Sequence, residues 1–109
     1  MSHSLTKIWI HLIFGTKDRM PLIKESFEKK LYEHIKQIIE IDFKSLLYAI
    51  NGTADHIHIL ILQNQNYSIA DIAKNLKGNS SHWINENGFT NLKFAWQTGY
   101  GAFSVSESM

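Results

Sequence analysis

The alternation of apolar and polar positions divides the chain into segments with two different periods. Short β-branched or aromatic runs have the composition of strands, whereas apolar residues spaced three or four apart indicate amphipathic helices. The predicted strands are residues 7–14, 45–50, 56–62 and 92–105, and the predicted helices are residues 22–41 and 69–86. We expect the last strand to be broken or bulged at Gly99 and Gly101.

Turn and capping residues mark the limits of these elements. Asn51-Gly52 is the dipeptide best suited to a tight hairpin, so we expect the second and third strands to pair through it. Ser68 is predicted to cap the second helix, in which Gly78 is a weak point that would permit a bend or a close backbone approach. Residues 104–109 resemble the start of a further helix, with Ser106 as its cap.

This order of elements is that of the ferredoxin-like βαββαβ sandwich, an α+β fold. Right-handed crossovers would place the third strand between the first and the second in an antiparallel sheet, with two helices on one face. The first strand is almost continuously apolar, so we expect it to be central and covered on both faces. One layer of helices leaves the other sheet face to solvent, a partner subunit or a ligand.

Two histidines interrupt the apolar third strand, in the run Asp55-His56-Ile57-His58-Ile59-Leu60. Because side chains alternate along a strand, His56 and His58 should share one face while the isoleucines point to the helices. Two buried imidazoles need polar partners, and a divalent ion is a suitable one. A single His-x-His is a weak signal, since most such pairs are surface or hydrogen-bonded core residues. We expect His11 in the first strand to be a hydrogen-bonded residue rather than a ligand.

Composition narrows the class of protein. A chain of 109 residues with 44% hydrophobic residues indicates one folded domain, residues 1–109. It has no apolar run of the roughly 18–20 residues that span a membrane, no signal-peptide core and no cysteine, so we expect a cytoplasmic protein. A net charge of +1 is small for a protein that binds duplex DNA, which relies on many contacts between cations and phosphates. Any binding of nucleic acid must therefore depend on local cations, aromatic stacking or a metal.

Four blocks of residues carry a resemblance that spans nearly the whole chain. They are the first strand with Thr16-Lys17-Asp18-Arg19, the hairpin into Asp55–Leu60, the segment Leu76–Ser81 and the segment Trp96–Ser106. In order and spacing these blocks resemble the single-tyrosine HUH transposases, which include insertion-sequence transposases and their REP-associated bacterial relatives. Four matching blocks are far more specific than the histidine pair alone.

The resemblance implies both an activity and a site. His56 and His58 would hold Mg²⁺ or Mn²⁺, which polarises the scissile phosphate of single-stranded DNA. A tyrosine hydroxyl would then attack and leave a covalent 5′-phosphotyrosine. Members of the family are homodimers that recognise hairpins in single-stranded DNA, with the tyrosine-bearing helix across the histidine face. The candidate DNA contacts in this chain are Lys17, Arg19, Lys74 and Lys77, although lysines at such positions are usually only solvated.

The sequence departs from the family pattern at the nucleophile. In the family, the tyrosine and a glutamine four residues later, which completes the metal site, lie in a helix after the Ser-Val-Ser segment; Met109 is reached where that helix begins. None of the four tyrosines matches the position: Tyr32, Tyr48, Tyr67 and Tyr100. We therefore expect a domain without its C-terminal catalytic helix, with no catalytic tyrosine and no DNA cleavage by this chain alone.

Two other classes of function compete with this hypothesis. A ferredoxin-like sheet can also act as a non-catalytic single-stranded nucleic-acid-binding module that stacks bases on aromatic residues. The aromatic candidates are Trp9, Trp96, Tyr100 and Phe103, although such residues are more often part of the core. A histidine-based hydrolase is disfavoured, because two-histidine phosphoesterases need a His-x-Ser/Thr motif in each half and the sequence after His58 lacks a zinc-hydrolase motif.

Overall fold

The structure of the chain is a computed structural model that describes residues 8–105. Its elements are β1 (Trp9–Gly15), the 3₁₀ turn η1 (Lys17–Arg19), α1 (Glu25–Gln37), its π-helical continuation η2 (Ile38–Asp42), β2 (Leu46–Gly52), β3 (His56–Leu62), α2 (Ile69–Glu86) and β4 (Gly101–Val105). Within residues 8–105, no helix is long and apolar enough to cross a membrane.

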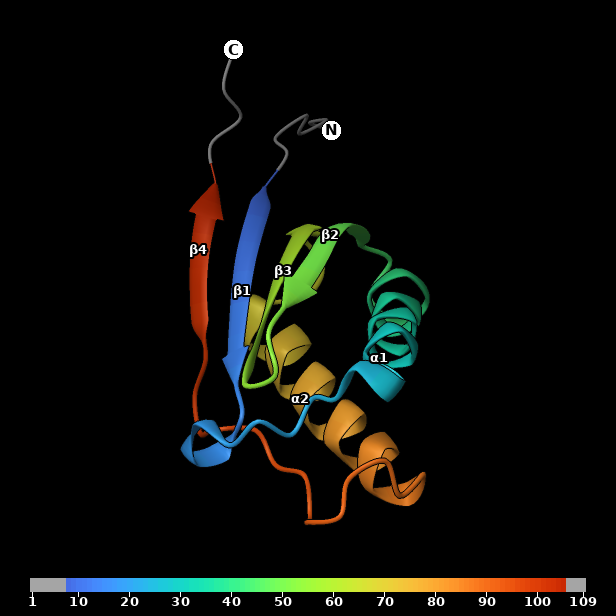
Figure 1. Cartoon of the computed structure of the whole chain (residues 1–109). Coiled ribbons are helices and arrows are strands. Elements are labelled where there is room, and N and C mark those ends of the chain that lie inside the picture. Colours follow the sequence, from blue (N-terminus) through green and yellow to red (C-terminus); the bar gives the residue numbers. More distant parts are fainter. Residues whose placement is uncertain (1–7, 106–109) are drawn as a thin grey trace, which may run out of the picture.

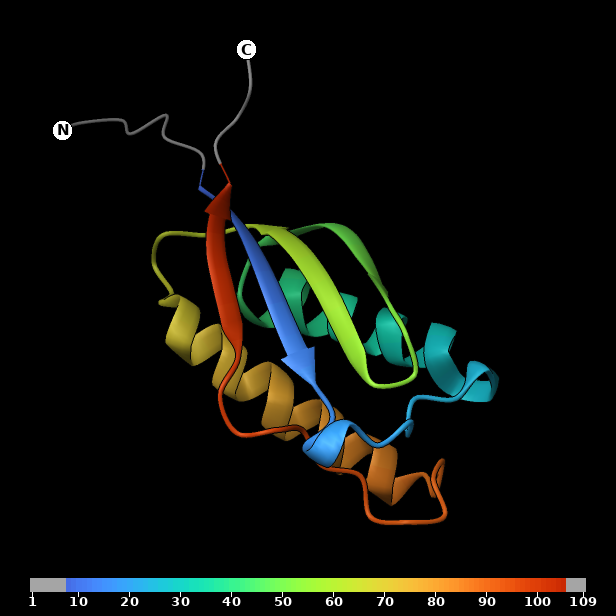
Figure 2. The same cartoon turned by 60° about the vertical axis from the view of Figure 1, so that its left-hand side comes forward.

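The four strands form one sheet in the order β2-β3-β1-β4, and every neighbouring pair is antiparallel. Both helices pack on the same face of this sheet, which leaves the other face without a helical layer (Figures 1 and 2). β3 lies between β1 and β2, as the crossover rule requires. The predicted ferredoxin-like α+β fold is confirmed.

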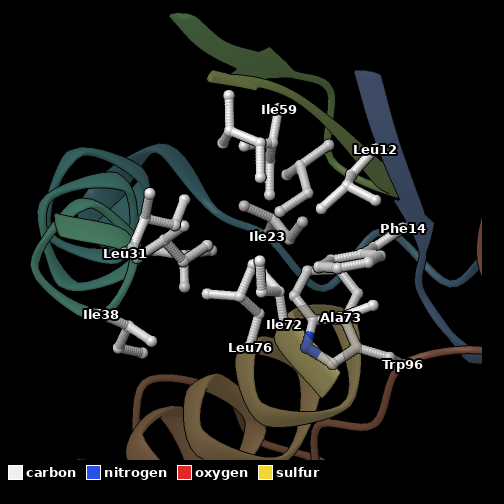
Figure 3. Packing of buried hydrophobic residues seen from close by; sticks show 14 of the residues in the cluster. Leu12, Phe14, Ile23, Leu31, Ile38, Ile59, Ile72, Ala73, Leu76 and Trp96 are labelled. Carbon is white, nitrogen blue, oxygen red and sulfur yellow. The ribbon is translucent and has the colours of Figure 1, made fainter. Parts of the chain in front are cut away.

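The hydrophobic core lies between the sheet and the helices. Figure 3 shows Leu12 and Phe14 of β1 and Ile59 of β3 pointing toward Leu31 of α1 and Ile72 of α2. The three isoleucines of β3 are fully buried, while the residues between them are half-buried. This alternation follows from the period of two in a strand and confirms the predicted orientation of β3.

β1 is central, as expected, but it is not covered on both faces. Only its alternate residues Ile10, Leu12 and Phe14 are buried, and the residues between them are half-buried on the open face. The apolar residues on that side, such as Ile13, look toward the open face rather than into a second layer. The prediction from the continuous apolar run, that both faces of this strand are covered, was therefore wrong.

The hairpin between β2 and β3 differs from the prediction. Asn51 and Gly52 continue β2, where they pair with His58 and Ile57, and the turn is made by residues 53–55. The Thr53 amide donates to the carbonyl of His56 across this turn at 2.9 Å. Gly52 serves for close packing, because a Cβ there would lie 2.2 Å from the His56 carbonyl oxygen. A tight Asn-Gly turn at residues 51–52 was thus a wrong prediction.

The second helix forms as predicted at its ends but not at its centre. The Ser68 hydroxyl accepts from the Asp71 amide at 3.0 Å, and Gly88 follows the helix with a positive φ of 64°. α2 is continuous through Gly78, and a Cβ there would meet nothing within 4 Å. The expectation of a close backbone approach at Gly78 was therefore wrong, and the helix is not interrupted there.

The last predicted strand is much shorter than residues 92–105. Gly101–Val105 form the ladder with β1. The residues before them form a loop that returns to the end of β1, where the Gln97 amide donates to the Gly15 carbonyl at 2.7 Å and the buried Trp96 forms an isolated bridge with Thr16. Gly99 ends this loop with a φ of 83°, a value that favours glycine. Ser104 and Val105 belong to β4 rather than to a further helix. The rest of that predicted helix, residues 106–109, lies outside the described residues.

Candidate metal and DNA site

The two histidines of β3 lie side by side on the open face of the sheet. Their ring centroids are 4.9 Å apart, with the ring planes at 77°. Both side chains are half-buried, and Ile57 between them points into the core. The shared face predicted for His56 and His58 is confirmed, and it is the face that the helices leave uncovered.

The turn before β3 holds the ring of His56. Nδ1 of His56 lies 2.7 Å from Oδ1 of Asp55 and 2.9 Å from the hydroxyl of Thr53, which itself donates to Asp55 at 3.0 Å. The hydrogen bonds from His56 and Thr53 lower the pKa of Asp55, which keeps its carboxylate ionised. An ionised carboxylate accepts from Nδ1–H, so Nε2 of His56 is the ring nitrogen turned to further ligands.

The ring of His58 is held from the neighbouring strand. Nδ1 of His58 lies 2.9 Å from Nε2 of His11, which comes from β1 and is 47 residues distant in sequence. Burial lowers the pKa of His58, and the charges of His56 and His11 lower it further, so His58 is neutral at neutral pH. The neutral imidazole is the form that binds metals. The prediction that His11 is hydrogen-bonded is confirmed.

The donor atoms of this pair suit a divalent ion but do not complete a site. Within residues 8–105, no group of three or more His, Asp or Glu side chains is arranged to hold a metal. His56 and His58 would therefore supply two nitrogen ligands, and the remaining ligands would come from water, the DNA phosphate or another protein segment. A hollow of about 350 Å³ adjoins His58, lined also by His11 and Leu60 among others, and His56 does not line it.

Two of the four predicted DNA contacts lie beside the pair. Lys17 and Arg19 are exposed on η1, directly after β1. Thr16 fixes this turn to the hairpin, because its amide and its hydroxyl both donate to the carbonyl oxygen of Asp55, at 2.8 and 3.1 Å. Arg19 lies 3.7 Å from the carboxylate of Asp55, which already binds His56. The structure thus brings both cations of η1 to the histidine end of the sheet.

The other two predicted DNA contacts are separated from each other. Lys74 is exposed on α2, in a hollow that it shares with Phe43 and Asn79. Lys77 is half-buried, and its ammonium donates to the carbonyl oxygens of Gln97 and Gly99, each at 2.7 Å. Lys77 therefore ties α2 to the loop before β4, whereas Lys74 points to solvent. Their spacing of three along a helix does not bring the two ammonium groups to one site.

None of the described tyrosines is placed as a nucleophile for this pair. Tyr100 packs edge-on against Phe14, a core residue on the helical side of the sheet. Tyr48 is on the open face but packs against Trp9 of β1. Trp9 lies four residues, or about 13 Å, along β1 from Ile13, the residue that pairs with His58. Tyr32 lies in α1 and Tyr67 packs on Phe43, both remote from the open face.

Three residues of the site are not among those that the sequence predicts for it. Thr53 and Asp55 orient His56, and Thr16 joins η1 to the hairpin. The sequence Thr-x-Asp-His does place an acceptor beside the histidine, so this signal could have been found. The pairing of Thr16 with Asp55 depends on the strand register and is not visible in a local window.

The comparisons with known proteins concern nearly the whole chain. The family model described as "Transposase IS200 like" matches residues 4–109. A crystal structure of a protein provisionally described as a transposase from Deinococcus radiodurans R1 is 24% identical, with a TM-score of 0.81 over 98% of this chain and 85% of that one. A REP-associated tyrosine transposase bound to a REP hairpin is 14% identical, with a TM-score of 0.67 over 99% of this chain and 64% of that one. No curated protein sequence matches the chain.

Proposed function

The chain belongs to the family of IS200-like transposases, whose general function is DNA transposition, and we propose that its histidine pair holds a divalent ion at the scissile phosphate of single-stranded DNA. One observation carries this proposal: the rings of His56 and His58 lie 4.9 Å apart on the uncovered sheet face. The cations of η1 stand at the same end of the sheet.

The chemistry of the two ligands narrows the choice of ion. Bound at this position, Mg²⁺ or Mn²⁺ would polarise a phosphate oxygen and stabilise the charge that develops there. Imidazole suits borderline transition metals better than it suits Mg²⁺, which prefers oxygen ligands. A site with two imidazoles should therefore bind Mn²⁺ more tightly than Mg²⁺.

None of the four tyrosines, all of which lie within residues 8–105, is placed as a nucleophile for this pair. In a tyrosine mechanism a phenol hydroxyl attacks the phosphorus, the 3′-oxygen leaves, and a 5′-phosphotyrosine keeps the bond energy for rejoining. Because none of the four tyrosines stands beside the pair, we propose that residues 1–109 form a transposase-like HUH endonuclease domain without its catalytic helix. The domain would then bind metal and DNA but would not cut DNA by itself.

The DNA partner in this proposal is a single strand with a hairpin. The REP-associated neighbour is bound to a REP hairpin, which supports a partner of this kind. Lys17 and Arg19 would contact phosphates next to the metal. Lys74 and Lys77 remain predicted contacts for flanking DNA, although Lys77 would act partly through the loop that it holds. The predicted cytoplasmic location is kept as part of this proposal.

We also propose that the domain forms a homodimer. The open face and β4 expose large apolar side chains, with Tyr48 68%, Phe103 57% and Val105 42% exposed. A soluble monomer seldom exposes such residues side by side. Analytical ultracentrifugation of the purified chain tests this proposal: a dimer is expected, and a monomer at every accessible concentration would contradict it.

Metal binding is the primary test of the proposed function. We expect His56→Ala and His58→Ala each to weaken Mn²⁺ binding at least tenfold, as measured by calorimetry. His82→Ala is the matched control, because His82 is exposed on α2 and bonds to Glu86; this variant should bind Mn²⁺ like the original chain. Equal Mn²⁺ affinity in all variants would overturn the proposed site.

DNA binding and cleavage are tested with the same protein. A hairpin-bearing single strand should bind in the presence of Mn²⁺, and Arg19→Gln should reduce the slope of affinity against salt by about 0.7, whereas Lys29→Gln on exposed α1 should not. No covalent adduct should form with the chain alone. A DNA adduct on any of its tyrosines would contradict the proposed lack of cleavage.

A second candidate function is supported by one observation. Trp9, two residues before His11 in β1, and Phe103, which pairs with His11 from β4, are on the open face and could stack single-stranded bases without a metal. The other two aromatic candidates do not join them, because Trp96 is buried in the core and Tyr100 packs on the helical side. Affinity for a single strand that is unchanged by EDTA would favour this non-catalytic binding module.

A further inference from the structure

The two histidines of the pair are held by different chemical groups. His56 has a carboxylate at Nδ1, which can only accept a hydrogen bond. His58 has a second imidazole at Nδ1, the Nε2 atom of His11 at 2.9 Å. A neutral imidazole nitrogen either donates or accepts, according to its tautomer. Either His11 or His58 can therefore donate the hydrogen bond between them, whereas His56 must donate to its carboxylate partner.

Only one of the two arrangements permits His58 to bind a metal. If Nε2–H of His11 donates to Nδ1 of His58, the proton of His58 is on Nε2, and no lone pair faces outward. If Nδ1–H of His58 donates to Nε2 of His11, then Nε2 of His58 carries a lone pair toward the open face. The second arrangement also requires His11 to carry its own proton on Nδ1.

We propose that His11 is a positioning residue that accepts the Nδ1–H of His58 and thereby presents Nε2 of His58 to the metal. This inference rests on the proposed function, because it concerns the same ion. His11 does not act as a third ligand, since its Nε2 is directed at His58 and within residues 8–105 no three-residue ligand group occurs. It does for His58 what Asp55 does for His56.

The position of His11 in the sheet supports a fixed geometry. His11 pairs in register with Leu60 on β3 and with Phe103 on β4, so its ring is flanked on both sides. The ring centroid of Phe103 is 6.4 Å from that of His11, and the centroid of His58 is 5.1 Å from it. A ring fixed between two strands loses little freedom when it accepts a hydrogen bond, which is what an orienting partner needs.

Mn²⁺ affinity separates hydrogen bonding from packing. His11→Phe keeps a ring of similar size but has no acceptor, and we expect it to weaken Mn²⁺ binding about 10-fold or more. His11→Gln retains an amide oxygen that can accept, so it should recover part of the affinity. The control is Ile13→Val, since Ile13 is on the same face and pairs with His58; its Mn²⁺ affinity should stay within about twofold of the original chain. Circular dichroism establishes that each variant is folded.

Nitrogen NMR gives a readout that a structural role would not change. In the original chain with Zn²⁺ as a diamagnetic probe, His58 should show a protonated Nδ1 and a metal-bound Nε2. In His11→Phe without metal, His58 should show a mixture of tautomers. A His58 ring that keeps its proton on Nε2 at saturating Zn²⁺ would overturn the inference.

The outcomes distinguish this inference from the proposed function. If His58→Ala abolishes Mn²⁺ binding while His11→Phe leaves the affinity unchanged, the metal site stands and the role of His11 is refuted. If His58→Ala has no effect on Mn²⁺ binding, the metal site itself is refuted. Weak binding in His11→Phe, partial recovery in His11→Gln and an unchanged Ile13→Val together support the inference.

Discussion

Replacement of glycine by alanine can be tested at a crowded position, Gly52, and at an open one, Gly78. At Gly52 an added Cβ would lie 2.2 Å from the carbonyl oxygen of His56 and 2.8 Å from the Cα of Ile57. Both are backbone atoms, so neither can rotate away as a flexible side chain could. A carbon and an oxygen need about 3.2 Å, so the hairpin backbone would have to move by roughly 1 Å.

The expected loss of stability can be worked from these distances. Overpacking against a backbone costs about 1–3 kcal/mol. The same movement weakens the hydrogen bond from the Thr53 amide to His56, worth about 1 kcal/mol. Against this, alanine restricts the unfolded chain and returns about 0.4–1 kcal/mol. We therefore expect Gly52→Ala to lower the free energy of unfolding by roughly 1–3 kcal/mol.

Gly78→Ala is the matched control, with an effect of opposite sign. Gly78 lies inside α2, and its added Cβ would meet nothing within 4 Å. Alanine in a helix interior is more favourable than glycine by about 0.5–1 kcal/mol, so this variant should be more stable than the original chain. Urea unfolding followed by circular dichroism measures both changes.

The same hairpin carries the orienting groups of His56, which gives a second readout. A shift of about 1 Å at the turn moves Thr53 and Asp55 away from the ring, so Gly52→Ala should also weaken Mn²⁺ binding, whereas Gly78→Ala should not. If Gly52→Ala unfolds at the same urea concentration as the original chain, the close approach at this glycine does not matter and the reasoning is wrong.

Three further predictions concern polar side chains of the two helices. Ser80→Ala removes the acceptor of the Trp96 indole N–H (2.9 Å), so we expect a loss of about 1–3 kcal/mol in urea unfolding and a change in tryptophan fluorescence. Lys77→Met removes two hydrogen bonds and should cost about 1–3 kcal/mol, whereas Lys74→Met on the exposed face should stay within about 0.5 kcal/mol. Burial and the nearby carboxylate of Glu28 raise the pKa of Tyr32 to about 12, above its usual value of 10.0. The unfolded chain then loses this proton first, so stability should fall as the pH rises from 10 to 12, and Tyr32→Phe should remove that part of the fall in the urea midpoint.

Each of these predictions has a result that contradicts it. An unchanged unfolding midpoint in Ser80→Ala would mean that water replaces the serine hydroxyl. Equal effects of Lys77→Met and Lys74→Met would show that the two carbonyl contacts of Lys77 contribute nothing. A Tyr32→Phe variant with the same alkaline loss as the original chain would place the titrating group elsewhere.

The periods of the sequence sufficed to predict the fold and the shared face of the histidines. Both depend on local rules: alternation in β3 decides which side chains share a face, and the order of elements together with crossover handedness decides the strand order. The prediction of the hairpin turn also used a local rule, but its signal was ambiguous. Asn51-Gly52 has the chemistry of a turn, yet the same glycine also permits backbones to approach, and here tertiary packing decided between the two.

The partners of the site residues could not be predicted in the same way. His11 reaches His58 because the β1–β3 register pairs Leu60 with His11 and His58 with Ile13, which makes the two histidines diagonal neighbours. A shift of the register by one residue would send the partner to the other face. No window of sequence contains this information. Likewise, the position of Lys77 in the second helix does not indicate its contacts, which lie about twenty residues further along the chain.

The four blocks that resemble the transposase family are one connected structure. Ser80 and Lys77 of the Leu76–Ser81 block bind the loop of the Trp96–Ser106 block, through the indole N–H of Trp96 and the carbonyl oxygens of Gln97 and Gly99. The side-chain oxygen of Gln97 accepts from the Asp18 amide of η1, and η1 is fixed to the hairpin through Asp55. Three of the four blocks therefore form a supporting structure, the frame, and only the hairpin block contains the histidine pair. Because the frame sets where η1 stands, variants remote from the pair, such as Lys77→Met, should change DNA affinity more than metal affinity.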